Sequence, residues 1–337
     1  MIRIAVIGCG AIADAFHLPA LRRGSMGEAS LTLVDPDLER ARALARKHGI
    51  GDVAADHRDV AGSIDAAIIA SPHSTHVPIG LDLLAAGVPI LVEKPLGTST
   101  EDIRALRDVS AHTSVPVAVN HTRRFMPATA EIRRLVREGA LGEPQRTDVA
   151  EGNPFAWPAA TASMFGRRSE GRGIILDVGV HVLDLMTWWF GPDLNLDAYR
   201  DDSFGGSEAA AQVELSSGPF TISIRLSWLA KQRNTYLIEG AEATLEWGIY
   251  DLDLVSITSR RTGRRSSMNI RGGARTPSEV ASQVHADFAQ AISTGRRPMV
   301  APEDCLASMR LIEACYERRQ RFDMPWHLPQ GQFEHVL

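Results

Sequence analysis

A short apolar strand that leads directly into a glycine-rich turn is the feature that most constrains the fold of this chain. Met1-Ile2-Arg3-Ile4-Ala5-Val6-Ile7 is followed by Gly8-Cys9-Gly10-Ala11-Ile12-Ala13, and residues 11 to 23 then have a helical pattern. In such a strand-turn-helix unit, glycine permits a tight turn and a close backbone approach, and the unpaired amides at the start of the helix attract phosphate. The pattern predicts that Gly8, Gly10, Ala11 and Ile12 hold the pyrophosphate of a dinucleotide.

The order of the expected elements predicts two domains of the α/β class. A chain of 337 residues exceeds what one hydrophobic core usually supports. Apolar runs that alternate with helical patterns predict a doubly wound parallel sheet in residues 1–122. The strands are expected near 2–7, 30–34, 66–70, 89–92 and 115–119, and the helices near 11–23, 37–48, 75–87 and 100–112.

The second domain, residues 123–337, is expected to bind substrate and to form oligomers. From about residue 145 the apolar and polar residues alternate, as in 220–226 and 235–240, which favours an open, largely antiparallel sheet. Two helices are expected near 278–294 and 303–320, and these could pack back on the first domain.

The composition favours a soluble globular protein and excludes several other classes. Hydrophobic residues make up 44% of the chain and charged residues 23%. The formal charge of −5 gives no reason to expect binding to nucleic acid, although it leaves room for local basic patches. Three cysteines are too few and too scattered for a disulfide framework or a four-cysteine zinc site. The longest apolar stretch, 174–190, contains Asp177, His181 and Asp184, so we expect no membrane span. The first residues lack a signal-peptide cleavage pattern, and a cytoplasmic location is expected.

Asp35 ends the second expected strand, about 20 residues after the glycine turn, at the position where a carboxylate accepts hydrogen bonds from the adenosine ribose. The run Asp35-Pro36-Asp37 would also repel a 2′-phosphate, and no arginine follows Asp35 immediately. NAD is therefore predicted as the cofactor, with NADP less favoured.

Two further loops follow buried strands and should lie at the carboxyl edge of the sheet, where open α/β sheets bind ligands. In the first loop, Ser71, Pro72, His73 and His76 are expected to line the cofactor cleft, although a surface turn with a helix cap is an equal alternative for both histidines. In the second loop, Glu93 and Lys94 of Glu93-Lys94-Pro95 are expected to face the same cleft. Lys94 could bind the reacting oxygen, and the alternative is an exposed lysine in a salt bridge.

Asp177, His181 and Asp184 stand at helical spacing and should share one face of a helix. His181 is the candidate general acid and base, Asp177 would orient it or contact substrate, and Asp184 would support the site from behind. A zinc site would need a third ligand and an open position, which no spacing supplies, so no metal is predicted. The remaining alternative is a buried structural histidine.

Together these motifs resemble the Gfo/Idh/MocA family of oxidoreductases, because Gly8-x-Gly10-x-x-Ala13, Glu93-Lys94-Pro95 and Asp177-x-x-x-His181 occur in the order seen there. The resemblance implies an N-terminal Rossmann domain, a C-terminal α/β domain whose open sheet serves in oligomer contacts, and reversible oxidation of sugar or cyclitol alcohols with NAD(P). It also implies that Lys94, Asp177 and His181 are catalytic, that the Lys94-Pro95 bond is cis, and that Asn120 or Thr122 lies near the nicotinamide. The run Gly171-Arg172-Gly173 departs from the consecutive glycines common in the family.

The residues expected to bind substrate are Lys94, Trp157, Arg168, Asp177 and His181. Trp157 lies in Asn153-Pro154-Phe155-Ala156-Trp157-Pro158, an aromatic segment that could stack on a sugar ring or could equally serve packing. Arg167, Arg168 or Arg172 could contact a nucleotide sugar, and an amino sugar is a further alternative.

These observations predict an NAD-dependent dehydrogenase that acts on a small-molecule sugar, sugar derivative or cyclitol, assembled as a homodimer or homotetramer. Two alternatives use the same fold. One is a regulatory sensor that binds NAD without turnover. The other is an enzyme that retains its cofactor and oxidises one sugar while reducing another.

Overall fold

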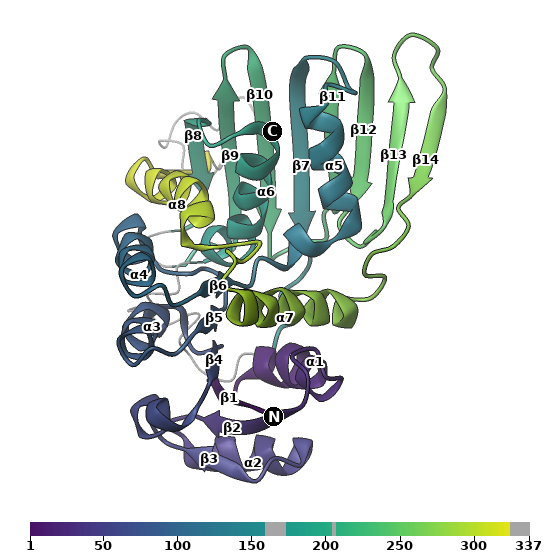
Figure 1. Ribbon diagram of the computed structural model, residues 1–337. Helices are drawn as coiled ribbons and strands as arrows, with labels where there is room; N and C mark the ends of the chain where they lie inside the picture. The colour runs from purple at the N-terminus through teal and green to yellow at the C-terminus, as the bar shows by residue number, and fades with distance from the viewer. Residues whose placement is uncertain (159–172, 204–206, 324–337) are drawn as a thin grey trace, which may run out of the picture.

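Two β-sheets, one in each half of the chain, form the framework of the molecule (Figure 1). The computed structural model describes residues 1–158, 173–203 and 207–323. Among these residues, no helix combines the length and the apolar character that a bilayer crossing requires.

The first sheet is parallel and has the strand order β3-β2-β1-β4-β5-β6. The direction of winding reverses between β1 and β4, so the loops that follow these strands open a crevice at the carboxyl edge of the sheet. Its strands are β1 (Ile2–Ile7), β2 (Ala29–Val34), β3 (Asp52–Ala54), β4 (Ala66–Ile69), β5 (Ile90–Val92) and β6 (Val117–Val119).

Helices cover both faces of this sheet, as the alternating sequence pattern predicts (Figure 1). Asp37 and Ser99 cap two of them by accepting hydrogen bonds from the amides of Arg40 and Asp102. The single helix expected over 11–23 is instead a π-helical turn followed by a short α-helix. The elements are η1 (Ala13–His17), α1 (Leu18–Arg22), α2 (Leu38–His48), η2 (His57–Asp59), η3 (Ala61–Ser63), η4 (His73–Thr75), α3 (His76–Ala85) and α4 (Thr100–Thr113).

The second sheet is mixed and largely antiparallel, with the order β14-β13-β12-β11-β7-β10-β9-β8-β15. Only the pairs β7–β10 and β8–β15 of the described strands are parallel. Its strands are β7 (Pro144–Gly152), β8 (Asn195–Asp201), β9 (Ala210–Ser217), β10 (Phe220–Ser227), β11 (Thr235–Gly240), β12 (Ala243–Gly248), β13 (Leu254–Ser259), β14 (Arg265–Asn269) and β15 (Gln320–Arg321). Both sheets confirm the fold class predicted from the sequence.

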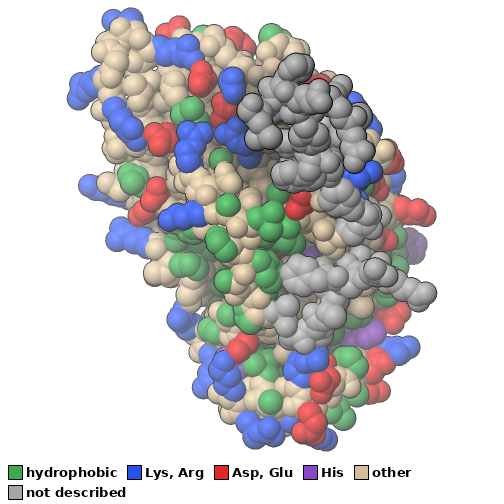
Figure 2. Space-filling view, turned by 180° about the vertical axis from the view of Figure 1, so that it is seen from behind, with side chains coloured by type: hydrophobic (Ala, Val, Ile, Leu, Met, Phe, Trp, Pro, Cys, Tyr) green, Lys and Arg blue, Asp and Glu red, His purple; other side chains and the backbone are tan. Residues whose placement is uncertain are grey.

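One face of the second sheet packs against helices, and the opposite face is turned outward (Figures 1 and 2). In β10 the residues Phe220, Ile222 and Ile224 are buried, whereas Thr221, Ser223 and Arg225 between them are at least partly exposed. This period of two is the pattern of a strand with one solvated face. The elements of the helical layer and the segments that flank it are η5 (Thr122–Phe125), α5 (Pro127–Arg137), η7 (Ile175–Gly179) and α6 (Val180–Phe190).

The last two helices, α7 (Pro277–Thr294) and α8 (Pro302–Glu317), return to the first domain. Val284 and Phe288 of α7 are buried in the same apolar cluster as Leu18 and Leu21 of α1. The segment between α7 and α8 also joins β6, where the Val119 amide donates to the Val300 carbonyl at 3.0 Å. These contacts hold the two sheets in a fixed relation and position the cavity between them.

Candidate active site

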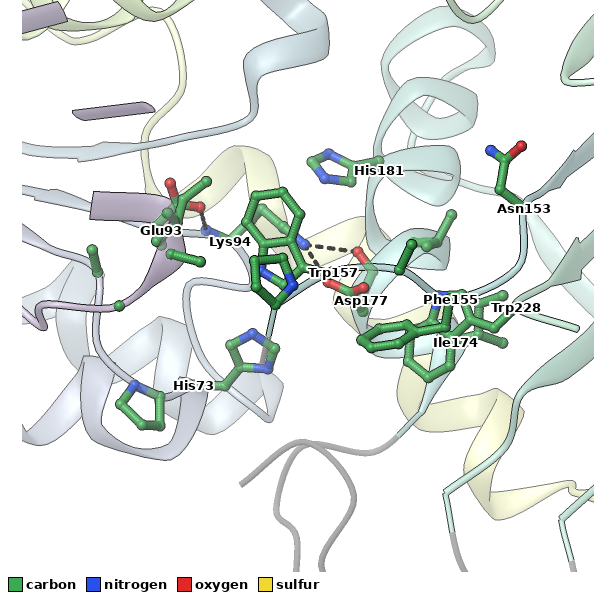
Figure 3. A pocket seen from close by; sticks show the side chains of 18 of the residues that line it. His73, Glu93, Lys94, Asn153, Phe155, Trp157, Ile174, Asp177, His181 and Trp228 are labelled. Carbon is green, nitrogen blue, oxygen red and sulfur yellow. Dashed lines mark hydrogen bonds and ion pairs between the residues drawn. The ribbon is translucent and has the colours of Figure 1, made fainter. Parts of the chain in front are cut away.

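A cavity of about 690 Å³ lies where the carboxyl edge of the first sheet faces the second domain (Figure 3). Both domains contribute to its wall, which includes the residues Gly8, Gly10, Ala11, Ile12, Asp35, Ser71, Pro72, His73, Glu93, Lys94, Trp157, Asp177 and His181. The structure therefore brings most of the predicted site residues together.

The glycine turn lies against the neighbouring loop so closely that no side chain fits at its first position. Gly8 has φ +97°, and a Cβ there would lie 2.6 Å from backbone atoms of Ala70 and Ser71. Gly10 has no neighbour within 4 Å of the corresponding position, so its face toward the cavity is open. A flat, open backbone surface that leads into η1 fits the close approach of a pyrophosphate.

Asp35 is fixed at the end of β2 by backbone donors. Its Oδ2 accepts from the Cys9 amide and its Oδ1 from the Asp37 amide, both at 2.9 Å. Arg40, which also lines the cavity, lies 3.3 Å from Oδ1 and donates to Asp37 at 3.1 Å. Arg40 was not predicted because it does not follow Asp35 immediately, but the first turn of α2 returns its side chain to Asp35.

The two histidines of the 71–76 loop have different surroundings. His73 lines the cavity, and burial, followed by the charges of His76 and Lys94, lowers its pKa to about 3. His76 is fully buried, and its ring nitrogens lie 2.8 Å from the Pro95 carbonyl and 2.9 Å from the Ser71 carbonyl. His76 therefore supports the loop from behind the wall rather than facing the cavity as predicted.

Asn120 also lies behind the wall, in contact with Glu93. Its Nδ2 donates to Glu93 Oε1 at 2.5 Å, and only 2% of the residue is exposed. Asn120 thus supports a carboxylate that does line the cavity, and its contact with the cofactor stays a prediction.

Lys94 and Asp177 form an ion pair between the two domains (Figure 3). The Lys94 ammonium donates to Asp177 Oδ1 at 2.7 Å and to the Asp177 carbonyl at 2.9 Å. Burial alone would raise the pKa of the Asp177 carboxyl, but the charge and hydrogen bond of Lys94 lower it below the ordinary value of 3.8. The pair therefore persists at neutral pH. The Lys94-Pro95 peptide bond is cis, as the resemblance implied.

His181 lies on the cavity wall, one residue into α6. Burial, and then the charges of Lys94 and Arg123, lower its pKa well below the ordinary value of 6.5, so the imidazole is neutral. The His121 ring faces it edge-on, with the ring centroids 6.1 Å apart.

The expectation that Asp177, His181 and Asp184 share one helical face is only partly right. Asp177 lies in the π-helical turn η7, before regular α-helical geometry begins at Val180. Asp184 does not face the cavity, because both of its carboxylate oxygens accept from Arg124, at 2.7 and 2.9 Å, in the interior. The aspartate that supports the site therefore binds Lys94, not His181.

A second ion pair in the cavity wall was not predicted. Arg123 donates to Glu151 at 2.5 and 2.8 Å and to the Tyr236 hydroxyl at 2.9 Å, and both Arg123 and Glu151 line the cavity. Burial opposes the charge of Arg123, yet Glu151 and Tyr236 raise its pKa overall. Arg123 directly follows Thr122, which the resemblance placed near the nicotinamide, whereas Glu151, near the end of β7, has no local sequence signal.

Aromatic side chains line the cavity on the side of the second domain (Figure 3). Trp157 is 47% exposed, and the Phe155 and Trp228 rings meet edge-on with their centroids 5.2 Å apart. Arg168, and with it Arg167 and Arg172, lies outside the described residues. Within the described part of the chain, no group of three or more His, Cys, Asp or Glu side chains is arranged to hold a metal ion.

Comparison with known proteins identifies the class to which this fold and site belong. Residues 2–121 match the oxidoreductase family with an NAD-binding Rossmann fold, and residues 129–246 match the GFO/IDH/MocA C-terminal domain. The chain belongs to the Gfo/Idh/MocA oxidoreductase family.

Among individual proteins, inositol 2-dehydrogenase 4 of Saccharopolyspora erythraea is 33% identical over 205 residues, which cover 59% of this chain and 57% of that protein. The match thus spans little more than half the length of that relative. KijD10, a 3-ketoreductase from Actinomadura kijaniata solved with NADP and TDP-benzene, has a TM-score of 0.82 at 22% identity, covering 96% of this chain and 99% of the other. A levoglucosan dehydrogenase solved with NADH and levoglucosan has a TM-score of 0.81 at 18% identity, covering 94% and 98%. The two structures share the fold of this chain.

The lowered pKa of His181 leads to a direct test by ¹⁵N NMR of histidine-labelled protein. We expect the His181 ring to remain neutral from pH 8 to below pH 6, because protonation would place a charge beside Lys94 and Arg123. An unfolded chain binds this proton near the ordinary value of about 6.5, so acid should destabilise the fold through His181. Titration of His181 at or above its ordinary pKa would contradict the described surroundings.

Proposed function

We propose that the protein is an NAD-dependent oxidoreductase that interconverts a secondary alcohol and a ketone on a sugar, a sugar derivative or a cyclitol. The observation that carries the proposal is that the Lys94–Asp177 pair and His181 line the same cavity as the glycine turn and Asp35. Groups that can bind a reacting hydroxyl thus face a surface that suits a dinucleotide.

The residues of the first domain fit NAD. A Cβ would fill the space at Gly8, and the Asp35 carboxylate is held at the end of β2 where a ribose can donate to it. The pyrophosphate would be held by the turn from Gly8 to Ile12, and the wall beside it is formed by Ser71, Pro72, His73 and Glu93. When bound, the nicotinamide supplies the carbon that accepts or donates hydride.

The proton is handled by residues of this chain. Lys94 donates a hydrogen bond to the reacting oxygen, while Asp177 holds the ammonium in place. His181 is neutral and can accept the hydroxyl proton when the alcohol is oxidised and return it when the ketone is reduced. The charge that develops on the oxygen is stabilised by Lys94, which is already oriented before substrate binds.

The described wall of the cavity favours an uncharged substrate. Each lysine or arginine in this part of the wall has a carboxylate partner: Lys94 pairs with Asp177, Arg123 with Glu151, and Arg40 with Asp35. Phe155, Trp157 and Trp228 offer ring faces on which a sugar or cyclitol ring can stack. Inositol 2-dehydrogenase and levoglucosan dehydrogenase are named for neutral polyols or sugars, which supports the same class here.

Replacing Lys94 tests the catalytic assignment. Lys94→Met should remove turnover, because the reacting oxygen loses its charged donor, while NAD binding stays largely intact. Turnover is measured by reduced-nicotinamide absorbance across neutral sugars, inositols, amino sugars and nucleotide sugars, and binding by quenching of tryptophan fluorescence. Wild-type activity in the variant would refute the role of Lys94. If the wild-type protein turned over none of these compounds, a sensor would become the better explanation.

The choice of NAD can be tested at Asp35. We expect kcat/KM for NAD to exceed that for NADP, because Asp35 and Asp37 repel a 2′-phosphate and already engage Arg40. Asp35→Ser should weaken NAD use by roughly tenfold or more, since a hydrogen bond to a charged group is lost, and should improve NADP use because Arg40 is released. Asp37→Ser is the matched control: it keeps a cap for α2 and leaves the ribose contact in place. Comparable wild-type turnover with both cofactors would overturn the NAD assignment.

We also propose that the chain forms a homodimer or homotetramer through the outward face of the second sheet. Alternate residues of β10, including Thr221, Ser223 and Arg225, present a broad polar surface there. Light scattering at micromolar concentration should give the mass of two or four chains. Charge reversal at Arg225 should lower the measured mass toward that of a single chain. A monomeric mass for the wild-type protein would refute self-association.

A further inference from the structure

Behind the cavity, four side chains from three distant parts of the sequence form one line of hydrogen bonds. His17 Nε2 lies 2.9 Å from Glu93 Oε1, and His17 Nδ1 lies 2.9 Å from His285 Nε2. His285 Nδ1 lies 3.0 Å from the Ser25 hydroxyl. Both histidines are fully buried, and their rings stack with centroids 5.2 Å apart. The line therefore joins α7, near the end of the chain, to the glutamate that precedes Lys94.

Glu93 sets the direction of these hydrogen bonds. Burial would raise the pKa of its carboxyl, but His17, Lys94 and Asn120 lower it overall, so Glu93 is ionised. An ionised carboxylate only accepts, and His17 Nε2 must therefore carry a hydrogen. If His17 carries this hydrogen alone, its Nδ1 is an acceptor and His285 Nε2 is the donor. His285 Nδ1 then accepts from Ser25.

The opposite order of these hydrogen bonds would require two ring hydrogens on His17. Burial, and then the neighbouring His17, lower the pKa of His285 well below its ordinary value, so His285 is neutral and has one ring hydrogen. If that hydrogen were on Nδ1, His285 Nε2 could only accept, and His17 would need a second hydrogen on Nδ1.

We propose that His285 is a positioning residue for the reaction, because its contact with His17 Nδ1 holds the His17 ring so that the Nε2 hydrogen donates to Glu93, next to Lys94. The proposal rests on the oxidoreductase function proposed above. Glu93 lines the cavity, and its Oε2 accepts from the Lys94 amide at 3.2 Å. Through this hydrogen bond, the carboxylate orients the backbone of Lys94.

Loss of His285 should act through Glu93. Without the contact at Nδ1, the His17 ring is free to turn, its Nε2 hydrogen no longer stabilises the Glu93 carboxylate, and Glu93 then binds a proton more readily. The other titratable groups whose charges act on or respond to Glu93 are His73, His76, Lys94, His121 and Asp177. These groups remain unchanged in a His285 variant, so a change in the pH dependence reports on the line itself.

The test compares His285→Leu with His285→Gln in steady-state turnover from pH 5 to 9. Leucine removes the donor, and we expect kcat to fall on the order of tenfold and the acid limb of the profile to move to higher pH. KM for NAD should remain close to the wild-type value, because the glycine turn and Asp35 are untouched. Glutamine carries an amide hydrogen at the matching position and should restore both kcat and the acid limb.

Phe288→Leu, on the same helix and in the same apolar cluster, is the matched control. It should lower the melting temperature without moving the acid limb. An unchanged kcat and an unchanged acid limb in His285→Leu would overturn the proposal. A loss of activity in both leucine variants with no shift of the acid limb would also overturn it, because disturbed packing of the core would explain that result.

A measurement on the wild-type protein decides the matter if His285→Leu fails to fold. ¹⁵N NMR should find the ring hydrogens of both His17 and His285 on Nε2, and a His17 hydrogen on Nδ1 would overturn the proposal. This NMR measurement does not require turnover. Absence of activity in the wild-type protein would therefore refute the proposed function, whereas the positions of the ring hydrogens test the inference about His285 separately.

Discussion

The ion pair between Lys94 and Asp177 is the interaction on which the site depends, because each partner comes from a different domain. Lys94 is placed by the end of β5, and Asp177 by the turn that precedes α6. Neither side chain would be held in its position without the other domain. The packing of α7 on α1 and the link from Val119 to Val300 therefore contribute to the geometry of the site as well as to stability.

Much of the first domain could be predicted from the sequence because its signals are local. Strands buried on both faces appear as apolar runs, and Gly8, Asp35 and Glu93-Lys94 each stand at the end of such a run, so a shared edge of the sheet follows directly. The structure adds β3, a three-residue strand whose residues are partly exposed and which leaves no apolar run to detect. It also replaces two expected stretches of α-helix by π-helical turns, which hydrophobic spacing does not distinguish.

The site was less predictable wherever a residue's environment depends on distant parts of the chain. His76 and Asn120 follow the correct strands, but their polar atoms bind neighbours behind the wall, which sequence position does not reveal. Asp184 was expected to support the site from behind, but the sequence did not reveal its partner, Arg124, which lies 60 residues earlier in the chain. Arg123 of η5 and Glu151 of β7 are 28 residues apart in the chain, and the folded structure brings them together in the cavity wall.

The π-helical turns η1 and η7 limit where the chain can gain or lose a residue without altering the site. η7 contributes Asp177 to the cavity wall, and η1 directly follows Ile12 of that wall; each turn acts as a single additional residue within an otherwise α-helical path. Removing one residue from η7 would let the helix wind regularly, but it would rotate Asp177 relative to His181 by about 100°. Such a deletion could make the helix more regular and yet separate the two side chains from the reacting oxygen. Insertions and deletions in this stretch are therefore limited by the geometry of the site rather than by the stability of the helix.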